Sequence, residues 1–284
     1  MTVRAILHRH HAGVARVIGA AACLILSLWL GVRQAEALSL TSNRPYVEHT
    51  VAPGQVTRGS IELANQSSDP VRVSIYLQDW RYISAGDGSK EFAPAGTTPR
   101  SCANWVTLFP QQADIPGRGK LTVEYAIRVP DGQALDGGYY AILFTEGLIA
   151  EVSPNEDPEG ILVKYSARLG SLFMINVRGT EKYQASLASL RVQPPGAGSM
   201  IIEGVFRNEG NVALTCQGSF HAQSAQGLIL ARGELPMRYS WPGDQVPIRA
   251  EWSGTMPSGQ HQLVLTYDCG DQLIIGDEVP LTVP

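Results

Sequence analysis

The histidines, serines and glycine-rich stretches of this chain are the places to look for catalysis or metal binding. Three of the six histidines lie within the first 11 residues, and the other three are His49, His221 and His261. Their wide separation, without a His-x-x-x-His or Cys-x-x-Cys spacing, does not gather metal ligands. No Gly-x-Ser-x-Gly element offers a nucleophilic serine, and no glycine-rich loop opens a helix that could hold a phosphate. The sequence therefore predicts a binding protein with no catalytic residues, metal or cofactor.

The N-terminal segment has the features of an export signal. Arg4, Arg9 and Arg16 precede an apolar run over residues 17–32, and a small-x-small site follows at Ala35-Glu36-Ala37. This order is typical of a secretory signal peptide, residues 1–37, cleaved after Ala37. The alternative is a retained membrane anchor, because the run with its flanks approaches spanning length. We expect cleavage, and a protein that is periplasmic or, alternatively, at the cell surface.

The net charge of the mature chain indicates which classes of partner are compatible with it. Removal of residues 1–37 leaves 18 basic and 25 acidic residues, a formal charge of −7. A net negative charge argues against nucleic acid or an anionic membrane surface as the main partner. We therefore expect a protein partner, no nucleic acid, and no membrane attachment after cleavage.

Three cysteines remain after cleavage, and disulfides persist in an exported protein. Cys216 and Cys269 stand at the ends of two predicted strands in the same C-terminal region. We predict a disulfide between them, with Cys102 free or buried.

Residues 60–80 carry the clearest structural pattern of the chain. Alternating apolar residues lead into the polar turn Asn65–Pro70 and continue from Val71 to Leu77. Alternation broken by an Asn/Ser/Asp/Pro cluster predicts a β-hairpin with one buried face. The chain is therefore expected to build a β-sandwich.

The same pattern recurs along the chain and predicts an all-β fold of two immunoglobulin-like sandwiches in tandem. The 29 glycines and 18 prolines divide about 247 mature residues into short runs, too many for one sandwich. We place the domains at residues 38–180 and 181–284, and interpret residues 84–99 as a surface loop. The predicted strands are 39–40, 46–51, 56–64, 71–80, 106–109, 120–129, 138–146 and 161–177, then 186–192, 200–206, 213–221, 228–234, 248–252, 261–267 and 272–283.

Short turns repeat between the two halves. Asn208–Val212 echoes Asn65–Pro70, and Pro242–Gln245 echoes Pro53–Gln55. Such turns are common and can arise independently, so the repeat suggests two sandwiches of one class without proving it.

Several of these elements resemble the N-terminal domain of periplasmic pilus-assembly chaperones, the PapD-like immunoglobulin-fold family. The resemblance covers residues 38–178, and the second domain only in architecture. It is carried by Asn65, Gln78-Asp79-Trp80, Asn104-Trp105 through Phe109-Pro110, Pro116–Gly119 and Gly137–Tyr140. Trp80 and Trp105 are also of the kind that fills a sandwich core.

The resemblance implies a mechanism of edge-strand addition to a protein subunit that lacks one strand. Residues 161–169 fit such a donor strand, because Ile161, Val163, Tyr165 and Leu169 share one face, although an ordinary sheet strand shows the same alternation. The family also holds the subunit's C-terminal carboxylate with two basic residues. Arg44 and Arg168 are the corresponding candidates. The family usually has lysine as the second anchor, and Arg44-Pro45 is not its usual context.

A different class of function is also compatible with the sequence. Gly137–Tyr140 and the Asn65 region look like domains of Gram-positive surface proteins that bind peptidoglycan and partner proteins. The alternative is therefore an exported structural or adhesive module that binds a surface protein or a cell-wall polysaccharide. An exported hydrolase on an all-β scaffold is a third possibility, and it lacks a recognisable site.

Overall fold

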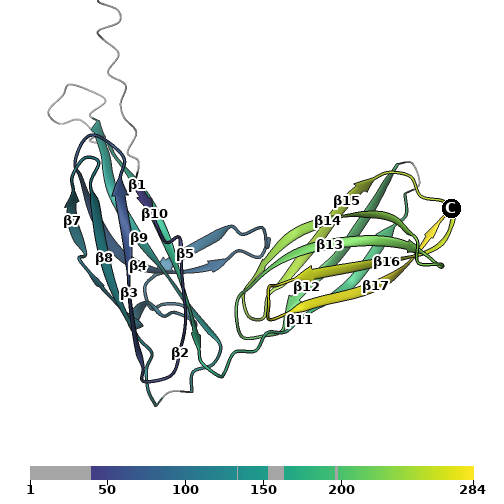
Figure 1. The fold of residues 1–284 in the computed structure, drawn as a ribbon, viewed down its shortest axis with the longest axis horizontal. Coiled ribbons are helices and arrows are strands. Elements are labelled where there is room, and N and C mark those ends of the chain that lie inside the picture. Colours follow the sequence, from purple (N-terminus) through teal and green to yellow (C-terminus); the bar gives the residue numbers. More distant parts are fainter. Residues whose placement is uncertain (1–39, 133, 153–162, 196–197) are drawn as a thin grey trace, which may run out of the picture. The chain divides into compact units, whose positions relative to one another are not determined.

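The computed structural model describes residues 40–132, 134–152, 163–195 and 198–284, with the backbone alone at 148–152 and 163–165. Ser39–Pro284 form one compact unit. The described residues form seventeen strands and one short 3-10 helix (Figure 1), which confirms the all-β fold class. Among them no helix is long and apolar enough to cross a membrane. The predicted signal peptide, residues 1–37, lies outside the described residues.

Strands β1 to β10 form two sheets, which we call the first sandwich. One sheet has the order β1-β3-β8-β6, and the other has the order β2-β10-β9-β4-β5, with β7 also paired to β4. The rings of Tyr125 in β8 and Phe173 in β10 meet between the sheets with centroids 5.2 Å apart. The strands are β1 Leu40–Ser42, β2 Tyr46–Val51, β3 Val56–Asn65, β4 Val71–Tyr82, β5 Lys90–Pro94, β6 Val106–Phe109, β7 Gln112–Ile115, β8 Lys120–Arg128, β9 Gly138–Val152 and β10 Val163–Val177, with the 3-10 helix at Ala103–Trp105.

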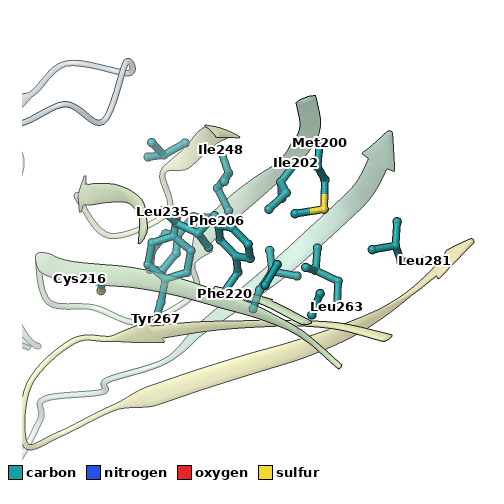
Figure 2. Close-up of a cluster of buried hydrophobic side chains, with 14 of the residues drawn as sticks. Met200, Ile202, Phe206, Cys216, Phe220, Leu235, Ile248, Leu263, Tyr267 and Leu281 are labelled. Atoms are coloured by element: carbon teal, nitrogen blue, oxygen red, sulfur yellow. The ribbon is translucent and has the colours of Figure 1, made fainter. Parts of the chain in front are cut away.

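Strands β11 to β17 form the second sandwich, from a three-stranded sheet β11-β12-β15 and a four-stranded sheet β14-β13-β16-β17. Phe206 and Tyr267 meet between these sheets, and Figure 2 shows them among the buried apolar side chains of this core. The strands are β11 Ala185–Gln193, β12 Ser199–Asn208, β13 Leu214–Ser224, β14 Ile229–Ser240, β15 Gln245–Ser253, β16 Gly259–Asp268 and β17 Ile274–Val283.

The polar turn at residues 65–70 does not close a hairpin, so that prediction was wrong. β3 ends at Asn65 and pairs with β1 and β8, whereas β4 begins at Val71 and pairs with β5, β7 and β9. The turn is therefore a corner at which the chain crosses from one sheet to the other. Alternation reports that one face of each strand is buried, and it does not say which strand lies beside it.

Residues 84–99 are not simply a surface loop. Lys90–Pro94 form strand β5, which pairs antiparallel with the end of β4 from Gln78 to Tyr82. The buried carboxylate of Asp79 then fixes the following turn, because it accepts hydrogen bonds from the N–H groups of Gly96, Thr97 and Thr98. The Gly/Pro/Thr composition indicated a loop, and the hairpin pairing of β5 with β4 overrode it.

Of the two tryptophans singled out in the sequence, Trp80 does not lie in the interior between the two sheets. Trp80 is 1% exposed, but it points to the side of β4 opposite Val73 and Ile75, where it joins a separate aromatic cluster. Trp105 is half-buried and packs on Tyr139 with ring centroids 4.5 Å apart. Burial of β4 on both faces explains the position of Trp80, because the alternating pattern predicted only one buried face.

Candidate functional site

Strand β10, which contains most of the predicted donor residues, is paired on both sides over only about a third of its length. On one side it pairs antiparallel with β9 from Val163 to Asn176. On the other side it pairs parallel with β2, and this pairing covers only Leu172–Val177. Within the described part of the chain, no strand pairs with the second side of residues 163–171. We call this stretch the open edge.

The backbone groups that face the open edge follow from the strand geometry. Leu172 donates its N–H to the carbonyl of Pro45 at 2.9 Å, so its polar groups point toward β2. Polar groups of alternate residues in a strand point to the same side. The N–H and C=O groups of Gly170, Arg168 and Ser166 therefore face the open edge, where a further strand could pair with them.

Side chains on the polar face of β10 form a cluster with β4 and β9. Arg168 is exposed and lies over the Phe144 ring, with its guanidinium carbon 5.0 Å from the ring centroid. Glu146 accepts hydrogen bonds from Tyr76 at 2.6 Å and from Ser166 at 2.8 Å. These two hydrogen bonds, Tyr76 first, hold the pKa of Glu146 below its usual value. The sequence patterns gave no signal for Tyr76, Phe144 or Glu146, since their meeting requires the β4-β9-β10 order.

The apolar face of the open edge is described only in part. Leu169 is half-buried, on the face opposite Ser166 and Arg168, as predicted from alternation. Val163 and Tyr165 lie in β10, where the backbone alone is described, and Ile161 lies outside the described residues. The role of these four residues stays a prediction.

Arg44 is exposed in the turn between β1 and β2. Its charge acts on two residues beside it, His49 and Tyr125, whose side chains are 3.1 Å apart. Burial first, then Arg44, lowers the pKa of His49, while burial raises the pKa of Tyr125 and Arg44 opposes that rise.

The neighbours that Arg44 and Arg168 have in the structure do not overlap. Arg168 interacts with Phe144, Tyr76 and Glu146, and not with the His49–Tyr125 pair beside Arg44. Where the open edge ends, the hydroxyl of Ser42, two residues before Arg44, is 3.3 Å from that of Ser171, three residues after Arg168. A joint role of the arginines in carboxylate binding stays a prediction.

The cysteines are placed as the sequence predicted. Cys216 and Cys269 form a disulfide across β13 and the end of β16, with 53 residues of separation in sequence. Cys102 is free and buried, and burial raises the pKa of its thiol. In the described ranges, no group of three or more His, Cys, Asp or Glu side chains could hold a metal ion.

Comparison with known proteins finds similarity in three dimensions alone. No family model matches the chain, and no curated protein matches it. Among solved structures it is similar to the YadV chaperone, with 10% identity, a TM-score of 0.46, and coverage of 85% of this chain and 99% of that one. It is also similar to the class 5 fimbriae chaperone CfaA, with 10% identity, a TM-score of 0.43 and coverage of 87% and 100%.

A third similar structure is the CsuC–CsuE complex, described as a chaperone–tip adhesion subunit pre-assembly complex from archaic chaperone-usher Csu pili of Acinetobacter baumannii. Here the identity is 13%, the TM-score is 0.43, and coverage is 85% of this chain and 97% of that chain.

Proposed function

We propose that this protein is an exported, periplasmic chaperone that binds subunits of pili or other surface structures through the open edge of β10. One observation carries the proposal: β10 is paired on its second side only from Leu172 to Val177, so no described strand pairs with that side of residues 163–171. The function is therefore binding of a protein chain, without catalysis.

Strand addition explains why such an edge would be kept. An unpaired edge strand is a liability, because its N–H and C=O groups are a template for any other extended chain. A subunit that lacks one strand would pair its backbone with Ser166, Arg168 and Gly170. It would take the apolar residues Val163 and Tyr165 into its own groove, which supplies affinity through the backbone and selectivity through the side chains.

The two arginines extend this proposal to the end of the bound chain. Arg44 and Arg168 are both exposed. Arg44 acts on His49 in β2, and Arg168 lies over the ring of Phe144 in β9. β2 and β9 are the two strands that pair with β10. Guanidinium groups bind carboxylates through charge-assisted, sometimes bidentate, hydrogen bonds. We assign both to recognition of a subunit carboxylate, and a double change to alanine should weaken capture while leaving the fold intact.

The experiment separates the backbone of the open edge from its side chains. Ser166→Pro removes an N–H that faces the open edge, whereas the matched Ser166→Ala change keeps it, and each loses the hydroxyl that contacts Glu146. Each version is purified from the protein's own host, and the co-purifying subunit is identified and quantified by mass spectrometry. We expect Ser166→Ala to retain the subunit and Ser166→Pro to lose most of it, with melting temperatures that match.

Two results would overturn the proposal. Equal capture by both variants would show that the open edge does not pair with the partner. Recovery of a polysaccharide, or of a surface protein bound independently of β10, would instead support the structural or adhesive module that the sequence also allows.

A further inference from the structure

The tip of the β4–β5 hairpin, residues 83–89, contacts the second sandwich, and we call this segment the strap. Its Gly86 carbonyl accepts a hydrogen bond from the Tyr239 N–H at 3.2 Å and a longer one from Arg238 Nη1 at 3.5 Å. Arg238 is only 6% exposed, so its charge is buried where the strap meets β14. A buried guanidinium is costly unless polar groups surround it, which makes the strap carbonyl part of its environment.

The hydrogen bond to Gly86 covers part of the free edge of β14. β14 is an edge strand in the order β14-β13-β16-β17, and the N–H of Tyr239 points away from β13 toward Gly86. An edge N–H would otherwise be exposed to water. The strap carbonyl therefore accepts a hydrogen bond from this edge N–H of β14.

Glycines let the strap approach this closely. A Cβ atom on Gly86 would lie 1.8 Å from Cγ1 of Val246, and one on Gly88 would lie 2.9 Å from the Tyr239 ring. Hydrogen bonds within the strap hold its shape, from Gly86 N–H to Ile83 O at 3.2 Å and from Ser89 N–H to Asp87 Oδ1 at 2.9 Å. The strap therefore packs against Val246 and Tyr239 too closely for a side chain at Gly86 or Gly88.

Aromatic side chains from both sandwiches pack beside the strap. The ring centroids of Trp80 and Trp241 are 5.7 Å apart, and those of Tyr140 and Trp241 are 4.2 Å apart. Tyr82 and Tyr239 lie 5.3 Å apart, and the Lys90 ammonium is 5.4 Å from the centre of the Tyr82 ring. Trp80, Tyr82 and Tyr140 are buried, and such pairs add directional contacts to the burial of apolar area.

A second group of polar contacts joins the same two parts of the chain. The Ala213 N–H donates to the Tyr140 hydroxyl at 2.5 Å, and the Gly138 N–H donates to Asn211 O at 2.9 Å. The Asn211 side chain in turn donates to Asp136 at 3.0 Å. Two separate sets of contacts restrict rotation more than either set alone.

We propose that the strap is a conformational lock that joins the two sandwiches into one rigid body. Because the strap extends β4, and β4 is linked through β9 to β10, the lock also fixes the second sandwich with respect to the open edge. The lock goes beyond the proposed chaperone function and holds whatever partner the open edge takes. Its test therefore needs no partner.

The test uses two glycines with similar backbone conformation. Gly86 has φ +66° and faces Val246, whereas Gly132 has φ +72° and has nothing within 4 Å of a Cβ position. Gly86→Ala and Gly132→Ala therefore introduce comparable backbone strain, and only the first disturbs the lock. Adding Val246→Ala to Gly86→Ala removes the atom that the new methyl group would meet, and serves as the rescue.

Two measurements on the full chain report on the lock. Hydrogen exchange of the Tyr239 amide reports the strap bond, and the distance distribution between spin labels on Glu124 and Glu251 reports relative motion of the sandwiches. For Gly86→Ala we expect Tyr239 exchange to rise by about tenfold or more and the distribution to broaden. Gly132→Ala should match the unchanged protein, and Val246→Ala should restore much of the protection.

Each contrary result decides against the lock. It is overturned if Gly86→Ala and Gly132→Ala give the same Tyr239 exchange and the same distance distribution. The unchanged protein supplies a check that does not depend on any variant folding: Tyr239 exchange at the rate of an exposed amide would also exclude the strap bond.

Discussion

Asn65 and Asn208 hold the same kind of corner in the two sandwiches. Each donates its side-chain amide to the carbonyl four residues later, Asp69 at 2.8 Å and Val212 at 2.9 Å. Each accepts, at 3.0 Å, the N–H of the residue two positions later. Each corner carries the chain from one sheet to the other, between β3 and β4 and between β12 and β13. The turns that echo each other in the sequence are therefore equivalent in structure.

The two corners should differ in how much they stabilise the fold. Asn65 also donates to Pro116 O at 3.1 Å and accepts the Ser67 hydroxyl at 2.6 Å, so it makes more contacts than Asn208. We expect Asn65→Ala to lower the free energy of unfolding by about 2 to 3 kcal/mol and Asn208→Ala by about 1 to 2 kcal/mol. Urea unfolding measures both. Asn43→Ala, which removes one exposed hydrogen bond, is the control, and an equal loss in all three variants would contradict the assignment.

Asp79 should be among the most sensitive polar positions of the first sandwich. Its carboxylate is 0% exposed and accepts three backbone N–H groups and, at 2.5 Å, the hydroxyl of Ser101. Asp79→Asn replaces one acceptor oxygen with a donor that faces other donors, so we expect a loss of about 3 kcal/mol in the free energy of unfolding. Asp114→Asn, which changes an exposed ion pair with Arg72, should have little effect, and similar losses in the two variants would exclude the special role of Asp79.

The Cys216–Cys269 disulfide should stabilise the protein by constraining its unfolded state. A bridge across 53 residues contributes about 4 kcal/mol in the chain-entropy model. The double change of these cysteines to alanine should therefore lower the melting temperature in oxidising buffer, and reductant should have no further effect on it. In the native protein, Cys102 should not react with a thiol reagent, because its thiol is buried and its pKa is raised. Peptide mapping that joined Cys102 to another cysteine would contradict this assignment.

His49 should make stability depend on pH. Burial first and Arg44 second lower its pKa below 6.5, so the native state binds fewer protons than the unfolded state between the lowered pKa and 6.5. Stability should fall as the pH drops through that interval and level off below it. Melting temperatures from about pH 7.5 to about pH 5 should show this fall, and His49→Gln should reduce it. Arg44→Gln should raise the pKa of His49 in an NMR titration, and a native pKa of 6.5 or higher in the unchanged protein would contradict the prediction.

Val163 and Tyr165 distinguish a donor strand from an ordinary core strand. Changing both to Asp places charge on the apolar face of β10. If this face enters a partner's groove, as we propose, capture is lost while the isolated protein melts as before. If it instead packs inside the first sandwich, unpaired buried charges should unfold a marginally stable domain. A large fall in the melting temperature of the isolated double variant would therefore reject the donor role of these residues.

Local patterns in the sequence predicted the elements of this protein well. Alternation of apolar residues predicted strand character over most of the observed strands, for example β8 and β10, because a strand with one buried face must alternate. The placement of Cys216 and Cys269 at two strand ends of one region predicted their bridge. The division of the chain at residue 180 stays a prediction, although among the described strands no sheet mixes β1–β10 with β11–β17.

Only the tertiary structure decided which strands pair along their edges and which faces pack against each other. Alternation records burial of a face, whereas pairing of an edge depends on residues far away in sequence. The sequence therefore did not show that the turn after Asn65 carries the chain from one sheet to the other. It also did not show that β2 pairs with β10 only from Leu172 to Val177, or that Gly86 packs against Val246. Each is a non-local contact whose formation depends on the whole fold. The sequence by itself determined an all-β chain with a potential donor strand, and long-range pairing decided that part of this strand has an open edge.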